Sequence, residues 1–411
     1  MKKNIFIIVT LLIFVILAVI VSFIFLKNKT NEKKSPDSEK FANINIEGQN
    51  LDNQNTSNFT LGDAGETGEG NDGTAKENPE AMRLRQITTT PVIGFNIVKE
   101  SYFGNNLVYY IRAGTGNIFY SDPKNNNFDN KISNTTVPGA YAGAISNNGE
   151  YVAIQAGLSN KKELLVGKIS TSTKSINFKS VARNVSQVYA TDESMFLYTI
   201  KTKGEFIIKQ YYPISEISEN ILSIPFREIT INWNNDRDNL SPYYVYANPA
   251  KQLEGVVYEI YNNTKKRLPI SGSALSAVGN KKFIIYSLYS NKDNRYKSFI
   301  YNIKEKSNSE LGFSVLPEKC INTKDKIVCA VDFNSNSNNL PDGWYKGLKN
   351  FSDQIISIEY DDGVIVRNLT SPEKVTGQNL DIVNLLTNND YLLFMDKKKN
   401  FVWQYKLDED F

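Results

Sequence analysis

The stretch that decides the fold is QITTTPVIGF, residues 86–95, which returns in altered form as KISNTTVPGA, residues 131–140. The two segments align without a gap at an offset of 45 residues, so that Ile87 meets Ile132. A fixed period of this length is typical of folds in which one small sheet is repeated along the chain. We therefore expect further copies of the same unit.

Seven apolar segments, each expected to be the innermost strand of a sheet, recur at this spacing. They begin at Val92, Val137, Val185, Ile229, Ala274, Cys320 and Leu380. A polar turn and a β-rich segment follow, as in AISNNGEYVAI (residues 144–154), where Asn148-Gly149 is a strong hairpin signal. Four-stranded sheets repeated every 40–45 residues predict an all-β fold, a seven-bladed β-propeller over residues 85–411.

The closing of the ring follows from the last unit, residues 380–411, which has room for three strands only. Residues 86–90 precede the first inner strand just as residues 131–135 precede the second. We expect residues 86–90 to be the missing fourth strand of the last blade, because stacked sheets must bury their faces and edges. The alternative is a chance similarity between two Thr-rich strands.

The N-terminal region predicts a membrane anchor. Residues 5–26 carry no charge and as a helix would span roughly 33 Å, which matches the hydrocarbon core of a bilayer. We expect one transmembrane helix in contact with lipid after a cytoplasmic head of residues 1–4; a cleaved signal peptide is the alternative. Lysines on the C-terminal flank favour the reverse orientation, but a short head before a long apolar run favours a C-terminal domain outside the cell membrane.

A polar linker follows, residues 27–84, which contains the acidic, Gly-rich stretch LGDAGETGEGNDG. Such a segment cannot bury enough apolar area to offset its ordering entropy, so we expect it to be disordered. It would serve as a tether for the domain or as an inert spacer.

Composition excludes several function classes. The chain has no histidine, which rules out Ser-His-Asp and Cys-His catalysis and a His-ligated zinc. Its net charge of +3 gives no sign of a nucleic-acid partner. Asp332, Asn334 and Asn336 alternate like part of a calcium loop, but Ser337 stands where glycine is needed. We expect no metal and no cofactor.

Two pairs of residues are candidates for a site. Cys320 and Cys329 flank a turn that would place them opposite each other, so they could form a disulfide or remain two buried thiols. Trp344 and Tyr345 lie in the long insertion 332–353 of the sixth unit, where a loop on a propeller face could bind a ligand. Alternatively, these two rings fold back to cap the ring.

The turn SNNG with the following YV, residues 146–152, resembles the WD40-like and TolB-type propeller repeat. Residues 85–411 also resemble a group of uncharacterised, membrane-anchored bacterial propeller proteins, through RQITTTPV, ISNTTVP, LPDGWY and DIVNLLTNNDYLLFM. The chain lacks the Gly-His and Trp-Asp signatures of true WD40 repeats. The resemblance implies a propeller at the membrane and brings no activity with it.

Two functions are compatible with these features. The first is a non-catalytic scaffold that binds a protein or glycan of the cell envelope. The alternative is a carboxylate-based enzyme, a glycosidase or lyase, which would need two carboxylates about 5–9 Å apart at the central channel. No spacing of Asp and Glu in the sequence identifies such a pair.

Overall fold

The structure is a computed structural model, and the chain divides into residues 1–41 and residues 42–411, of which only the second contains described residues. The described residues are 44–46, 83–124, 127–157, 162–191, 194–233, 242–323, 325–335, 337–361, 363–388 and 390–408. Within these ranges no helix is long and apolar enough to cross a membrane. The predicted span 5–26 and nearly all of the linker lie outside them.

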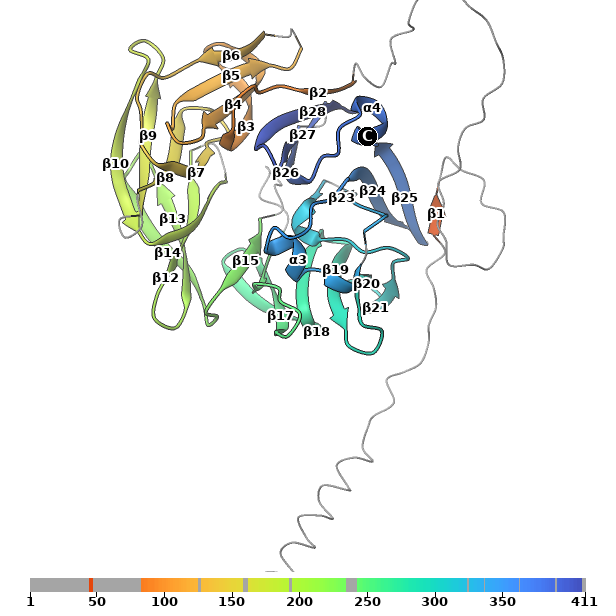
Figure 1. Cartoon of the computed structure of the whole chain (residues 1–411). Coiled ribbons are helices and arrows are strands. Elements are labelled where there is room, and N and C mark those ends of the chain that lie inside the picture. Colours follow the sequence, from red (N-terminus) through yellow and green to blue (C-terminus); the bar gives the residue numbers. More distant parts are fainter. Residues whose placement is uncertain are drawn as a thin grey trace, which may run out of the picture. The chain divides into compact units, whose positions relative to one another are not determined.

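Three four-stranded antiparallel sheets follow one another in chain order, each with its first strand toward the centre of the domain (Figure 1). Short polar turns join their strands, so sequence neighbours are also sheet neighbours. The strands are β3 (Val92–Ser101), β4 (Gly104–Arg112), β5 (Ile118–Asp122) and β6 (Asn127–Lys131); β7 (Ala140–Ile145), β8 (Tyr151–Ala156), β9 (Glu163–Ser170) and β10 (Ser175–Arg183); β11 (Val185–Ala190), β12 (Phe196–Lys201), β13 (Phe206–Tyr212) and β14 (Ile217–Ile224).

A seven-stranded sheet comes next. Its strands are β15 (Ile229–Asn232), β16 (Tyr243–Ala247), β17 (Glu254–Tyr261), β18 (Thr264–Gly279), β19 (Phe283–Ser290), β20 (Arg295–Asn302) and β21 (Ser307–Glu310). The sequence predicted a new inner strand from Ala274, but the chain continues through it as one 16-residue strand, β18. The first part of β18 pairs with β17 and the last part with β19, and Ala274 has a left-handed φ of 55° where the register shifts.

Two sheets complete the domain. One contains β22 (Cys320–Asn322), β23 (Ile327–Val331), β24 (Gln354–Asp361) and β25 (Gly363–Thr370), with β1 (Ile44–Ile46) parallel to β25; the other contains β26 (Ile382–Thr387), β27 (Tyr391–Asp396), β28 (Phe401–Lys406) and β2 (Leu84–Gln86). The short helices are η1 (Pro317–Lys319), η2 (Ser337–Asn339), α3 (Asp342–Tyr345) and α4 (Pro372–Thr376). Helices η2 and α3 lie in the predicted insertion between β23 and β24.

The start of the domain pairs with its end, as the repeated phrase predicted. β2 runs antiparallel to β28 with Arg85 opposite Gln404, and the Ile87 amide donates to the Val402 carbonyl at 2.9 Å. The strand starts at Leu84, two residues before the predicted Gln86, and it ends at Gln86.

The two copies of the phrase also match in their environment. Ile87 and Ile132 are both buried, at 1% and 0% exposure, and each donates its amide to the carbonyl of a neighbouring strand. The copies differ at the glycines. Gly94 lies within β3, whereas Gly139 has a left-handed φ of 71° in the turn before β7.

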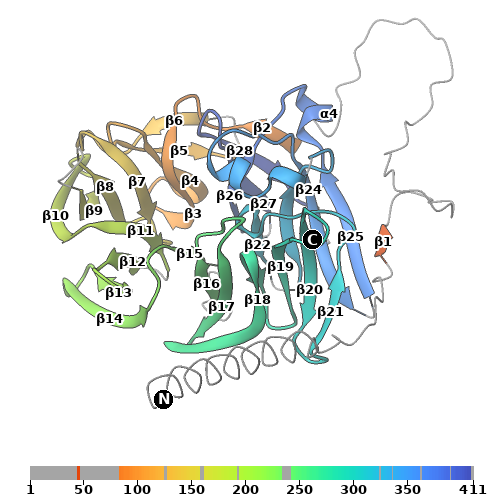
Figure 2. The same cartoon turned by 60° about the horizontal axis from the view of Figure 1, so that its bottom comes forward.

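Apolar side chains fill the spaces between successive sheets, and this burial is the main favourable term in their packing. Val98, Tyr109 and Val152 belong to the cluster that joins the first sheet to the second. Ile87, Val92, Leu386 and Leu393 belong to the cluster that joins the last sheet back to the first. Figure 2 shows the sheets following one another around a common centre, with β3, β7, β11, β15, β22 and β26 innermost.

Candidate functional site

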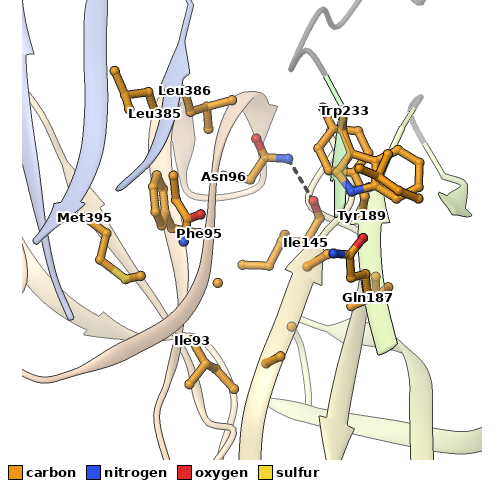
Figure 3. A pocket seen from close by; sticks show the side chains of 18 of the residues that line it. Ile93, Phe95, Asn96, Ile145, Gln187, Tyr189, Trp233, Leu385, Leu386 and Met395 are labelled. Carbon is orange, nitrogen blue, oxygen red and sulfur yellow. Dashed lines mark hydrogen bonds between the residues drawn. The ribbon is translucent and has the colours of Figure 1, made fainter. Parts of the chain in front are cut away.

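A cavity of about 470 Å³ lies where the inner strands converge. Its lining comes from β3, β7, β11, β15, β22 and β26, with a few residues from neighbouring elements. A site at the centre of such a ring collects side chains from segments that are distant in sequence. Figure 3 shows its apolar side, with Ile93, Phe95, Leu386 and Met395, and the opposite side with Gln187, Tyr189 and Trp233.

Bulges near the start of the inner strands turn side chains toward this cavity. The register shifts between Val92 and Gly94 in β3 and between Val185 and Gln187 in β11. A bulge inserts one extra residue and re-aims the side chains beside it, and it is common next to binding sites. Gly94 is required at this point, since a Cβ there would lie 2.1 Å from the carbonyl oxygen of Gly143 on β7.

Two aromatic rings form one wall of the cavity. Tyr189 of β11 and Trp233, which follows β15, stack with their centroids 5.4 Å apart and their planes 4° from parallel. Both side chains are only half-buried. Trp233 also packs against Tyr243, with the ring centroids 5.3 Å apart, so three aromatic rings form one group at this wall.

Amide side chains line the cavity, and some of them hold its walls together. Asn96 donates from Nδ2 to the Ile145 carbonyl at 2.8 Å, which ties β3 to β7 (Figure 3). Two glutamines differ from it: Gln155 Nε2 and Gln187 Oε1 are buried atoms without a partner among the described residues. Gln155 as a whole is 2% exposed.

Glu318 is the one charged side chain among the described residues of the lining. Its Oε1 accepts a hydrogen bond from the Tyr246 hydroxyl at 3.2 Å and another from the Tyr345 hydroxyl. Its Oε2 is buried and has no partner among the described residues. Burial raises the pKa of Glu318, and the two tyrosine hydroxyls oppose that rise. One carboxylate oxygen is thus fixed by two tyrosine hydroxyls, while the other is buried without a partner among the described residues.

The two predicted binding residues occupy different environments. Trp344 is 6% exposed, and its indole Nε1 donates to both carboxylate oxygens of Asp381, at 3.0 and 3.1 Å. Tyr345 keeps 39% of its surface exposed while its hydroxyl reaches Glu318. The insertion therefore meets the cavity lining through Tyr345, and Trp344 packs in the interior.

Trp344 belongs to a buried charged cluster that sequence reasoning missed. Lys319 Nζ donates to Asp353 Oδ2 at 2.5 Å and to Asp381 Oδ1 at 2.8 Å, and all three side chains are fully buried. Burial raises the pKa of Asp353 to about 6, against the opposing effect of Lys319. The partners lie 34 and 62 residues from Lys319 along the chain, so no local pattern announces them.

Cys320 and Cys329 are directly opposite on β22 and β23, and their sulfurs are bonded at 2.09 Å. Cys320 also lines the cavity. Three residues, Asp332, Asn334 and Asn336, alternate like part of a calcium loop in the sequence. Asp332 accepts a hydrogen bond from the Asn334 amide at 3.0 Å within its own turn, and Asn336 lies outside the described residues. In the part of the chain that the structure describes, no three His, Cys, Asp or Glu side chains gather as metal ligands would.

Neither a protein-family model nor a curated protein sequence matches this chain. Solved structures do resemble it, and the β-propeller domain of the Trilobed protease from Pyrococcus furiosus is 11% identical with a TM-score of 0.47, covering 77% of this chain and 96% of its own. Oligogalacturonate lyase in complex with manganese is 10% identical with a TM-score of 0.46, covering 74% and 86%. TolB from Acinetobacter baumannii is 12% identical with a TM-score of 0.35, covering 73% and 60%.

Similarity at this level concerns the fold alone. The class of the protein follows from its own strand topology. Successive antiparallel sheets with innermost first strands, the last packed against the first, make the described domain a β-propeller.

Proposed function

We propose that this chain is a membrane-anchored, extracytoplasmic β-propeller that acts as a non-catalytic binding module in the cell envelope, with a protein or glycan held at its central cavity. Residues 5–26 would be the anchor and residues 27–84 the tether. The length and charge-free character of residues 5–26 support the anchor, and the polar, Gly-rich composition supports the tether.

The proposal includes seven blades. The seven-stranded sheet counts as two blades that share β18, since β18 pairs with β17 through its first half and with β19 through its second. Packing supports this count. In the described residues seven apolar clusters join successive groups of strands, and one of them lies between the two halves of this sheet.

The observation that carries the binding function is the character of the cavity wall. A stacked aromatic pair, Tyr189 and Trp233, stands in one wall with polar side chains such as Gln187, and apolar side chains line the opposite wall (Figure 3). Ligand sites are typically cavities of about 300–1,000 Å³ that combine apolar walls with a few placed polar groups. The cavity of about 470 Å³ matches that description.

A second candidate function is favoured by Glu318. A buried carboxyl group with a raised pKa is the usual form of a general acid, and Glu318 belongs to the lining of the cavity, with no hydrogen-bond partner for Oε2 among the described residues. A glycosidase would also need a second carboxylate about 5–9 Å away. Among the described residues of the lining, Glu318 is the only carboxylate.

Two experiments test the proposed function. Protease treatment of intact cells should release the domain by cutting within residues 27–84, whereas cleavage only after lysis would contradict the extracytoplasmic location. Crosslinking in native membranes should then capture an envelope protein or glycan, and Trp233→Ala should reduce the capture. If the purified protein instead shortens a glycan and Glu318→Gln stops that reaction, the enzyme is the correct function.

A further inference from the structure

We infer that the outer edge of β25 is a strand-binding site, and that residues 44–46 of the same chain occupy it and thereby shorten the tether. This inference deepens the proposed function and rests on its membrane anchor. The observation behind it is β1, a three-residue strand of the linker that runs parallel to β25 as the fifth strand of that sheet (Figure 1).

The position of β25 in its sheet makes a strand-binding site possible. Among the described strands its neighbours are β24 on one side and β1 on the other. Without β1, one side of the β25 backbone would present a row of N–H and C=O groups, and such an edge pairs readily with an extended segment. Residues 44–46 therefore fill a place that the sheet itself leaves open.

The residues of β25 at this place are apolar on both faces. Val364 and Val366 belong to an apolar cluster, and Ile365, which faces the other side of the strand, is half-buried. The edge strands β14 and β21 begin with ISEN (residues 217–220) and SNSE (residues 307–310) instead. Proteins protect a sheet edge either with polar residues or by covering it, and an apolar edge calls for a cover.

The register places β1 on this apolar segment. Residues 44–46, Ile-Asn-Ile, pair one to one with residues 364–366. Isoleucine favours strands, and residues 27–84 contain no valine and no isoleucine other than Ile44 and Ile46. The one segment of the linker with β-branched apolar residues is thus the segment that pairs with the apolar edge.

The direction of β1 suits the path of the chain. Because β1 and β25 are parallel, the chain leaves β1 toward the end of β25 that leads to α4. Helix α4 in turn contacts β2, the strand that closes the ring. The chain therefore passes over β25 on its way to the region where β2 begins.

Pairing at β1 changes how far the domain can lie from the membrane. A residue of an extended chain spans at most about 3.3–3.6 Å, so residues 27–84 could reach about 200 Å. With residues 44–46 held on β25, only residues 27–43 would connect the anchor to the domain, and these reach about 60 Å at most. Release of β1 would therefore extend the reach of the domain about three-fold.

The strand is short enough for such a release. The ladder hydrogen bonds of three residues give only a small net gain over the entropy of ordering them. The covalent link to the domain offsets this weakness, since a short flexible connection acts like a local concentration in the millimolar range. A separate segment would need an affinity or a concentration beyond that range to displace β1.

Amide hydrogen exchange of the full-length protein in detergent micelles tests the pairing. Ile44→Asp with Ile46→Asp should speed exchange of the edge amides among residues 364–366 about 10-fold or more, because charged residues do not suit the apolar edge. Asn53→Asp with Asn55→Asp is the matched control, which adds the same charge to the linker outside β1 and should change nothing. Equally fast exchange in the wild type and both variants would overturn the inference.

A peptide and a dilution series identify the occupant. The peptide ANINIEG, which copies residues 42–48, should restore slow exchange in the Ile44→Asp, Ile46→Asp variant at millimolar concentration, and a peptide with both isoleucines replaced by aspartate should not. Protection in the wild type should be the same at about 1 and about 100 μM protein. Protection that increases with concentration would show that a second copy supplies the strand and would overturn the inference.

Energy transfer tests the shortened tether. A donor dye on Lys203→Cys, at an exposed turn, is paired with an acceptor on the lipids of nanodiscs that hold the full-length protein. The transfer efficiency should fall in the Ile44→Asp, Ile46→Asp variant and stay unchanged in the matched control; equal efficiency in all three proteins would overturn the effect on the tether. Failure of the protein to enter nanodiscs would instead contradict the anchor of the proposed function, while protected edge amides would still support the strand site.

Discussion

Glu318 and Lys319 are neighbours in helix η1, yet they face two different regions of the molecule. Lys319 points into the buried cluster, where its ammonium group meets two carboxylates. Glu318 lines the central cavity, where one carboxylate oxygen has no partner among the described residues. The comparison teaches that an unpaired oxygen does not by itself mark a site, because Asp353 Oδ1 in the buried cluster also has no partner among the described residues. What distinguishes Glu318 is its place in the lining of the cavity.

The buried cluster has a structural consequence of its own. Asp353 directly precedes β24, Asp381 directly precedes β26, and Lys319 ends η1. The ends of η1, of the insertion before β24 and of the segment before β26 thus meet at one ammonium group. Trp344 of the insertion also donates its indole N–H to Asp381. The cluster fixes the insertion, and through Tyr345 it fixes the edge of the cavity.

The largest expected effect is the loss of that ammonium group. Lys319→Met should lower the free energy of unfolding by about 3–5 kcal/mol, because it leaves Asp353 and Asp381 buried without their counter-charge. Urea unfolding measures the change. Lys203→Met, at an exposed turn, is the control and should stay within about 0.5 kcal/mol. Equal stability of the two variants would show that the Lys319 ammonium group does not stabilise the folded protein through Asp353 and Asp381.

The second prediction concerns pH. Because burial raises the pKa of Asp353 from 3.8 to about 6, the folded protein keeps a proton that the unfolded chain releases. The contribution of Asp353 to the free energy of unfolding should therefore fall by about 2–3 kcal/mol as the pH rises from about 4 to about 6. The difference between the wild type and Asp353→Asn should change across this window. Parallel stability curves for the two proteins would contradict the assignment.

The third prediction concerns Cys320, the residue that follows Lys319 in the chain. The disulfide to Cys329 closes a loop of about ten residues, so Cys320→Ser with Cys329→Ser should cost about 2–3 kcal/mol by the chain-entropy estimate. The bond also ties β22, the strand that follows η1, to β23. Mass spectrometry after alkylation without reductant should find neither cysteine labelled; two labelled thiols would mean that the bond is not formed.

The smallest expected effect concerns the indole donor of Trp344. Trp344→Phe keeps a ring in the apolar cluster but removes the donor to Asp381, which should cost about 1–3 kcal/mol. Urea unfolding measures the change. Trp403→Phe is the control, because Trp403 is equally buried within an apolar cluster, and it should lose less stability. Equal losses in the two variants would contradict a role for the hydrogen bond to Asp381.

Repetition made most of the ring predictable from sequence. The match of residues 86–95 with residues 131–140 located the strand that pairs with β28, because equivalent places in a repeat bury equivalent side chains such as Ile87 and Ile132. The continuity of β18 was not predictable. Polar and glycine residues around Ser273 looked like a break, but a single left-handed residue and a register shift let one strand serve both halves.

The site was much less predictable. A lone Lys in LPEKC looks like a solvated residue, and nothing nearby in sequence shows that Asp353 and Asp381 will surround it. Gln155 gave a weak signal, as a polar residue within the buried strand YVAIQA. Which glutamines lack partners depends on how several sheets meet around the centre, and that arrangement exists only in three dimensions.

The most direct test is a crystal structure of the domain. We predict seven blades around the central cavity, with β2 paired to β28 and the rings of Tyr189 and Trp233 stacked in one wall of the cavity. A ring closed by another strand, or a number of blades other than seven, would contradict the account.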